Sequence, residues 1–137
     1  MSPPKRLVRR KADPTPIVFY DGECRVCRLT VRLVLAADTG KRLRSATLDS
    51  AEADHHLGRL SKKDRYGSFH LYREGRLTSG EEAIGPLLEL LPPLRAVGRF
   101  LGRSERARGA TAWLYRGIAG RRALIGRFLP SVGPPPR

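Results

Sequence analysis

The chain has only two cysteines, Cys24 and Cys27, and they lie three positions apart. They follow a short apolar run, Ile17–Tyr20, and a turn-forming pair, Asp21 and Gly22. We expect the run to form a strand and a helix to begin at about residue 23, with both cysteines in its first turn. A C-x-x-C pair at a strand-to-helix junction is typical of thiol-disulfide exchange.

The start of a helix favours a negatively charged sulfur, because its first N–H groups lack intrahelical partners and the helix dipole is positive there. We therefore expect Cys24 to be the attacking thiolate and Cys27, on the same helix face, to close a disulfide with it. Arg25 and Arg28 add positive charge, whereas Asp21 would oppose a thiolate nearby. Asp21 would then act as the helix N-cap, or accept a proton from Cys27 during exchange.

Two other interpretations of the cysteine pair stay open. A zinc site needs four ligands, and the only further candidates are His55 and His56. Neighbouring residues of a helix point about 100° apart, which suits a single metal ion poorly. The cysteines could also be two unreactive thiols of the core. We expect neither a metal nor a cofactor, and we interpret the pair as redox-active.

Residues 20–27 place Asp21, Cys24 and Cys27 directly after the apolar run. Three later segments add to the resemblance described next: residues 46–50, 79–83 and 113–122. The last of these contains Tyr-x-x-x-Ala-x-x-Arg, carried by Tyr115, Ala119 and Arg122. Together they resemble the DCC family of thiol-disulfide oxidoreductases, which is named for an Asp and two Cys. The resemblance covers residues 16–129.

This resemblance implies a thioredoxin-like fold and an enzyme that exchanges its C-x-x-C disulfide with a protein or small-thiol substrate. The catalytic residues would be Cys24, Cys27 and Asp21. Thioredoxin-like proteins usually carry a cis-proline before the third strand, but the corresponding residues 65–68 contain no proline. Tyr66 or Ser68 would then line the substrate groove instead.

The sequence itself predicts an α/β fold. The first helix should run over residues 23–38, with Gly40 as its C-terminal cap, and lead into a parallel strand at 43–48. Asp49 and Glu52 should cap a helix at 50–60, followed by a loop at 61–65. Strands at 68–72 and 76–78 should form a hairpin. This β-α-β unit plus a hairpin is the strand inventory of a thioredoxin-like sheet.

An added helical region is expected after the sheet. Ser79 and Glu82 should form a capping box for a helix in which Pro86 causes a kink or a delayed start. Two helices should follow at 94–101 and 111–129, with 102–109 between them. We expect an apolar set on these helices to cover the core: Trp113, Ile118, Leu124, Ile125 and Phe128. The arginines between them should form a basic face: Arg116, Arg121, Arg122 and Arg127.

The net charge of +14 is concentrated at the two ends of the chain. Residues 17–91 carry twelve basic and eleven acidic residues, whereas residues 92–137 carry ten basic residues and one acidic residue. We expect a basic arm at 1–15, one domain at 16–129 and a Pro-rich disordered tail at 130–137. An alternative function is a basic module that binds nucleic acid or a membrane surface, with incidental cysteines.

The sequence contains neither the apolar core of a signal peptide nor a run of about 18 apolar residues, so we expect a cytoplasmic protein without a transmembrane segment. An exchanging thiol pair suits that reducing compartment. Arginine outnumbers lysine, with few aromatic residues for stacking on bases. We therefore expect any nucleic-acid binding to be weak, non-specific and sensitive to salt.

Overall fold

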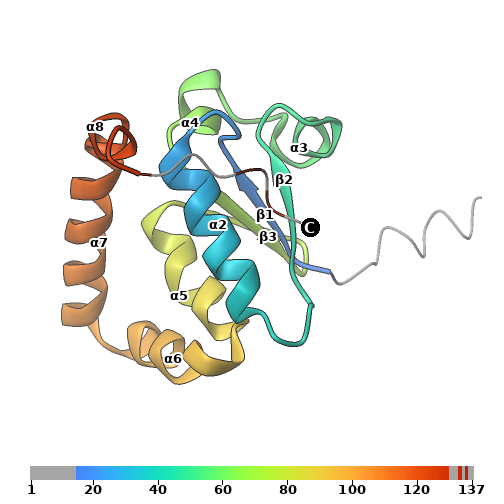
Figure 1. The fold of residues 1–137 in the computed structure, drawn as a ribbon. Coiled ribbons are helices and arrows are strands. Elements are labelled where there is room, and N and C mark those ends of the chain that lie inside the picture. The colour runs from blue at the N-terminus through green and yellow to red at the C-terminus, as the bar shows by residue number, and fades with distance from the viewer. Residues whose placement is uncertain (1–14, 130–132, 134, 136–137) are drawn as a thin grey trace, which may run out of the picture.

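The computed structural model describes residues 15–129, 133 and 135. Within this part of the chain, four strands form one sheet in the order β2-β1-β3-β4 (Figure 1). β1 (Ile17–Tyr20) pairs in parallel with β2 (Arg44–Thr47) and antiparallel with β3 (His70–Arg73), and β3 pairs antiparallel with β4 (Arg76–Ser79). The predicted β-α-β unit and hairpin are confirmed, and the mixed α/β architecture is that of a thioredoxin-like fold.

Helices cover both faces of this sheet. On one face, α2 (Arg25–Ala37) and α5 (Glu81–Glu89) pack against alternate residues of β1, Val18 and Tyr20. On the other face, α3 (Ala51–Leu57) packs against Ile17 and Phe19. Because successive strand residues point to opposite faces, the fully apolar run of β1 serves two cores and lies in the middle of the fold.

A buried carboxylate, and not the predicted glycine cap, orders the connection from α2 to β2. Asp38 is the C-cap of α2, is 1 % exposed, and accepts a 2.8 Å hydrogen bond from the Leu43 backbone N–H. The left-handed backbone conformation expected at Gly40 occurs instead at Lys41, with φ of 51°. Asp38 therefore orders the turn that returns the chain to the sheet.

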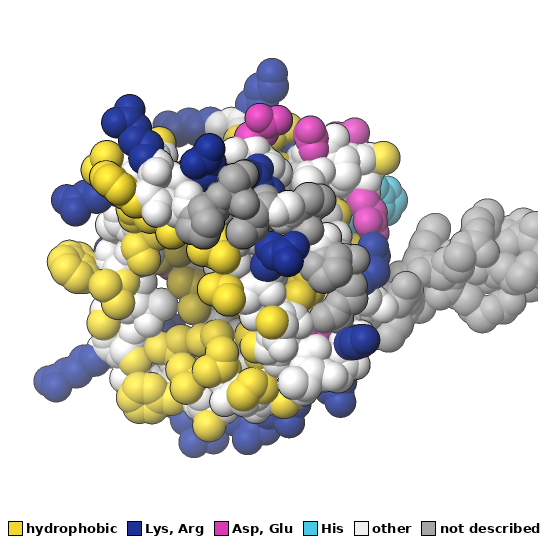
Figure 2. All heavy atoms as spheres, in the orientation of Figure 1, with side chains coloured by type: hydrophobic (Ala, Val, Ile, Leu, Met, Phe, Trp, Pro, Cys, Tyr) yellow, Lys and Arg dark blue, Asp and Glu magenta, His cyan; other side chains and the backbone are white. Residues whose placement is uncertain are grey.

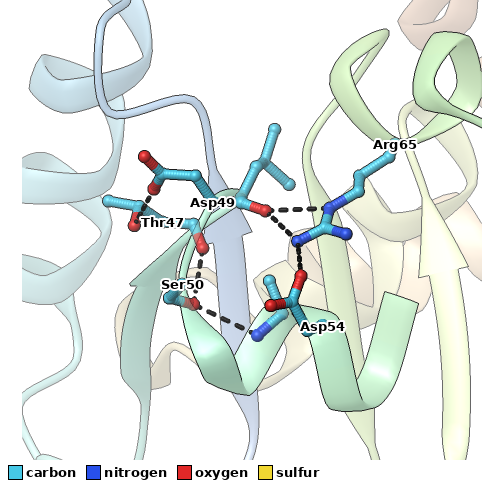
Figure 3. A network of polar contacts seen from close by, with 7 residues as sticks. Thr47, Asp49, Ser50, Asp54 and Arg65 are labelled. Atoms are coloured by element: carbon cyan, nitrogen blue, oxygen red, sulfur yellow. Dashed lines mark hydrogen bonds and ion pairs between the residues drawn. The ribbon is translucent and has the colours of Figure 1, made fainter. Parts of the chain in front are cut away.

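The segment after β2 is held by a polar network (Figure 3). Ser50, not Asp49, is the N-cap of α3, because the Ser50 hydroxyl accepts from the Ala53 N–H while Asp49 accepts from the Thr47 hydroxyl. Arg65 donates to the Leu48 carbonyl and forms an ion pair with Asp54.

The expected loop at 61–65 is wrong, since α4 (Lys62–Tyr66) begins there at the N-cap Ser61. The Arg65 network ties α4 to the junction of β2 and α3. The Arg65 carbonyl also lies 2.9 Å from Nε2 of His70, a buried residue of β3. This contact positions the segment between α4 and β3 beside the sheet.

The predicted hairpin turn is confirmed at Glu74 and Gly75, whose φ angles are 51° and 79°. These left-handed conformations suit a tight two-residue turn between twisted strands. The predicted capping box after the hairpin is wrong. Ser79 belongs to β4, where its hydroxyl lies 2.6 Å from Nδ1 of His70, and the N-cap of α5 is Gly80. α5 begins at Glu81 and continues through Pro86 without a delayed start.

The C-terminal helices differ from their predicted bounds. A short 3-10 turn, η1 (Pro92–Leu94), leads into α6 (Arg95–Arg103), and α7 (Glu105–Gly120) follows directly with Ser104 as its N-cap. The separate α8 (Arg122–Gly126) breaks the predicted long last helix. α6 crosses α5 closely at Gly98, where an added Cβ would lie 2.6 Å from the Glu89 backbone nitrogen.

The prediction that the C-terminal apolar residues cover the core is wrong for most of them. Trp113 is 71 % exposed and Phe128 is 82 % exposed, and Ile118 and Leu124 are also exposed; only Ile125 of this set is partly buried. α7 stands at the edge of the molecule, so only one side of it meets the rest of the fold (Figure 1). Among the described residues, none of the helices combines the length and apolar character needed to span a bilayer.

The predicted arm at 1–15 and tail at 130–137 fall almost entirely on residues 1–14, 130–132, 134 and 136–137, which lie outside the described residues.

Replacing Asp38 with Ala should lower the free energy of unfolding by about 1–3 kcal/mol, because the buried Leu43 N–H would lose its acceptor. Urea denaturation measures this loss. Asp38→Asn keeps an acceptor oxygen and is expected to lose less; an equal loss in both variants would contradict the acceptor role.

Candidate active site

The two cysteines lie at the corner between β1 and α2. Cys24 is the N-cap of α2, so the helix begins one to two residues later than predicted, and the Cys24 sulfur accepts a 3.2 Å hydrogen bond from the Cys27 backbone N–H. A sulfur here takes the place of the Ser or Asp oxygen that usually caps a helix. The pair is described as free thiols. The cap itself therefore holds the two residues in one turn.

Asp21 stabilises the turn that precedes the helix. Its carboxylate accepts a 3.0 Å hydrogen bond from the Glu23 N–H, and its carbonyl accepts one from the Cys24 N–H. The prediction that Asp21 is the N-cap of α2 is therefore wrong, because Cys24 is the N-cap. The other predicted role of Asp21, as a proton acceptor, stays a prediction. Arg28 reaches back from the helix and donates a 2.6 Å hydrogen bond to the Gly22 carbonyl. Local contacts within eight residues therefore hold the corner.

The two sulfur-bearing residues border different environments. Cys24 lines an open cleft of about 420 Å³ whose other walls carry charged groups from Asp21, Glu23, Arg122 and Arg127. Cys27 instead lines an almost wholly apolar cavity of about 310 Å³ between α2, α5 and α7 (Figure 2). A partner thiol or disulfide that enters the polar cleft therefore meets Cys24 first.

The pKa of the Cys27 thiol is raised to about 12, chiefly by burial and then by the hydrogen bond and the charge of Cys24. The Arg122 guanidinium lowers this pKa, and Asp21 opposes Arg122 with a smaller effect. An apolar environment disfavours the thiolate because it replaces the water that would solvate the charge. Cys27 is therefore a protonated thiol at neutral pH.

The C-terminal helices complete the site from nearly a hundred residues away in the sequence. Arg122 donates to the Cys27 sulfur over 3.8 Å and to the Tyr66 carbonyl over 3.2 Å. Tyr115, Ala119 and Arg122 all line the apolar cavity together with Cys27. Tyr115 and Ala119, four residues apart, share one face of α7, and Arg122 follows at the start of α8. The Tyr-x-x-x-Ala-x-x-Arg pattern is the signal that the sequence carried.

Arg122 was assigned to a solvent-facing basic surface by sequence reasoning, and the structure corrects this, because Arg122 turns toward the cysteines. Tyr115 anchors α7 through hydrogen bonds to the Phe69 backbone and the Ser68 side chain, and burial raises the pKa of its hydroxyl. The segment that lacks a proline therefore contributes a carbonyl from Tyr66 to Arg122 and a side chain from Ser68 to Tyr115.

The histidine pair lies elsewhere. His56 packs against Tyr72, with ring centroids 4.1 Å apart, and against Phe19 on the face of the sheet covered by α3. In the part of the chain that the structure describes, His, Cys, Asp and Glu side chains form no group of three or more that could hold a metal ion.

Comparison with known proteins gives one finding. Residues 18–128 match the DCC1-like thiol-disulfide oxidoreductase family. Neither the curated proteins nor the solved structures include a match to the chain. The matched residues contain the whole described site, from Asp21 to Arg122.

In a Cys24→Ser variant, alkylation of Cys27 by iodoacetamide should become about tenfold faster with each pH unit between about pH 7 and 9. Only the thiolate reacts, and burial, the largest cause of the raised pKa, remains after the contributions of Cys24 are lost. Mass spectrometry of quenched samples gives the rates. A short unstructured cysteine peptide serves as the reference and should level off near about pH 8.5. The same levelling in the folded variant would contradict a buried Cys27 thiol.

Adding Arg122→Gln to Cys24→Ser should slow the alkylation further, since a cation that favours the thiolate is lost. Arg122→Lys keeps the charge and is the matched control.

Proposed function

The chain belongs to the DCC1-like thiol-disulfide oxidoreductase family, and from this premise we propose that Cys24 is the nucleophile and Cys27 the resolving thiol of its exchange reaction. The observation that carries the assignment is the difference between the two environments. Cys24 borders the open, charged cleft, whereas Cys27 lines the apolar cavity and has a pKa raised to about 12.

In the direction of substrate reduction, the Cys24 thiolate attacks one sulfur of a substrate disulfide and releases the other as a thiolate. A mixed disulfide now joins Cys24 to the substrate. Cys27 then attacks the Cys24 sulfur and releases the second substrate sulfur as a thiolate, and this departing thiolate takes up the proton that Cys27 gives up. The C-x-x-C pair is oxidised to a disulfide and the substrate disulfide is reduced by two electrons. The reverse sequence oxidises a substrate dithiol.

The second step needs a thiolate at Cys27, and the raised pKa makes that costly. Arg122 supports this step, because its guanidinium is the group beside the Cys27 sulfur that lowers the pKa. Its second hydrogen bond, to the Tyr66 carbonyl, keeps the guanidinium from leaving the sulfur. Formation of the mixed disulfide also removes the negative charge of Cys24, which is one of the causes that raise the Cys27 pKa.

The substrate is a protein or a small molecule that carries a thiol or disulfide. The cleft beside Cys24 is open and polar, and Arg122 and Arg127 add positive charge to it. Asp21 and Glu23 line the same cleft, so it offers both signs of charge to the groups beside the reacting sulfur of a substrate. A reducing compartment such as the cytoplasm suits a pair that cycles between dithiol and disulfide.

Replacing Cys27 with Ser should trap mixed disulfides through Cys24, because the first attack still occurs and the resolving thiol is gone. With glutathione disulfide as the probe, intact-mass measurement should find the adduct on most of the Cys27→Ser protein. The matched Cys24→Ser variant should accumulate about tenfold less over the same time, since Cys27 is a buried, protonated thiol. Equal trapping by the two variants would reverse or remove the assignment.

Asp21 supports the corner structurally and is not required for the chemistry. Asp21→Asn keeps an oxygen that can accept from the Glu23 N–H and removes the charge that raises the Cys27 pKa. We expect exchange rates within a few-fold of the parent protein, and Asp21→Ala to lose about 1 kcal/mol of stability. If Asp21→Asn stays folded by circular dichroism but loses activity by orders of magnitude, Asp21 is a proton-transfer group.

A further inference from the structure

Large apolar side chains lie exposed on the three C-terminal helices. Figure 2 shows them gathered over α6, α7 and α8, with Lys and Arg side chains around them. Five residues define this α6–α8 apolar face: Phe100, Trp113, Leu114, Leu124 and Phe128. Phe100 is 59 % exposed, in addition to the more exposed Trp113 and Phe128. Single exposed apolar residues are ordinary, but a group of aromatic residues on adjacent helices marks an interaction surface.

α7 has two distinct sides. Tyr115, Ala119 and the following Arg122 point to the redox centre, whereas Trp113 and Leu114 lie on the opposite, outward side. Arg106 lies seven residues before Trp113, almost two full turns, and therefore on the same side of α7, whereas Arg121 is the exposed C-cap residue of this helix. A helix of 16 residues is about 24 Å long. An exposed arginine therefore lies near each end of α7, with the exposed Trp113 and Leu114 between them.

Positive charge surrounds the α6–α8 apolar face without acidic partners. Glu105 is the one acidic residue among positions 92–137. Five exposed arginines of this region form no ion pair with the described residues: Arg99, Arg103, Arg106, Arg121 and Arg127. By contrast, Arg116 pairs with Glu81 and Arg122 turns inward. The unpaired guanidinium groups are available to an anionic partner.

We propose that the α6–α8 apolar face binds the surface of a lipid bilayer that contains anionic phospholipids. Helices that lie in the interface bury an apolar side to the level of the first acyl carbons and keep Arg side chains at the headgroup phosphates. Trp113 has the amphipathic ring that favours this depth. Arg106 and Arg121 can extend their apolar stems along the surface while their charges meet phosphate oxygens.

Other occupants fit the charge and chemistry of this surface less well. A second copy of the chain would bring one set of unpaired arginines against another, and like charges oppose that contact. Nucleic acid would satisfy the arginines but would place Leu114 and Leu124 against a polar, charged backbone. A bilayer surface offers anionic groups and apolar depth together. Both alternatives are outcomes of the test below.

The redox cleft lies at one end of the α6–α8 apolar face. Arg127 lines the cleft beside Cys24, and Phe128, the next residue, belongs to the apolar face. Binding would therefore hold Cys24 close to the lipid surface. The inference itself does not depend on the thiol chemistry, since the binding surface and the cysteines are separate groups.

Trp113 provides a direct reporter, because it is the only tryptophan of the chain and is exposed. The full chain is titrated with phosphatidylcholine vesicles, with and without phosphatidylglycerol. With phosphatidylglycerol, the emission of Trp113 should shift to shorter wavelength and the protein should sediment with the vesicles. With phosphatidylcholine alone, binding should be at least tenfold weaker, and added salt should weaken the binding to anionic vesicles.

Two double variants separate the apolar and charged contributions. Phe100→Ser with Phe128→Ser should weaken vesicle binding about tenfold or more, because two exposed rings no longer enter the bilayer. Arg106→Gln with Arg121→Gln should weaken it about thirtyfold, since each basic residue at an anionic surface contributes about a factor of five. Arg59→Gln with Arg76→Gln removes the same charge outside the C-terminal helices and should change binding less than threefold.

Four results would overturn the proposal: no binding to anionic vesicles, equal binding to both vesicle types, equal loss in the charge variant and its control, or a concentration-dependent dimer that shields Trp113 without lipid. Tighter binding to a DNA or RNA duplex than to anionic vesicles at the same salt concentration would assign the surface to nucleic acid instead. Thermal melting confirms that each variant is folded, and the glutathione-trapping assay, run on each variant combined with Cys27→Ser, reports whether Cys24 still reacts.

Discussion

The first turn of α2 needs acceptors for its backbone N–H groups, and the redox centre is built on that requirement. The Cys24 sulfur accepts the Cys27 N–H, and the Asp21 carboxylate accepts the Glu23 N–H just before it. The same hydrogen bonds that begin the helix therefore fix the separation and direction of the two cysteines. β1 leads directly into this corner and anchors it, because the residues of β1 are buried on both faces of the sheet. The reactive end of the helix is thus attached to the most fully buried strand of the sheet.

The site also needs a cover over Cys27, and the C-terminal helices provide it. α7 and α8 return to the corner, where Tyr115 anchors to the segment before β3 and Arg122 lies against Cys27. Without these helices, the apolar cavity beside Cys27 would lose a wall and its thiol would meet water. The C-terminal extension is therefore part of the redox centre, and its inner side controls how readily Cys27 ionises.

The helical period explains why one short segment serves two surfaces. Residues spaced by three and four positions face inward, and the residues between them must face outward. In α7 the inward set carries Tyr115 and Ala119, and Arg122 follows at the start of α8, so Trp113 and Leu114 have only solvent or a partner to meet. Apolar side chains that stay largely exposed add little hydrophobic stabilisation to the fold. Their presence, with unpaired arginines beside them, is what indicates a partner surface.

The sequence by itself determined the local structure around the cysteines and the class of the sheet. β1, the turn at Asp21, the hairpin turn at Glu74 and Gly75, and the pairing of β1 with β2 follow from short-range patterns that tertiary contacts reinforce. The sequence could not decide which residue caps α3. Ser50 and Asp49 are both good N-cap residues, and contacts with their neighbours determine which of them caps the helix. The burial of the C-terminal apolar residues was mispredicted for a different reason. A periodic apolar pattern says that a helix has an apolar side, but only the packing of α6 against α5 sets which way α7 faces. That packing turned Arg122 toward Cys27 and Trp113 toward the outside, a choice made by contacts between residues far apart in the chain.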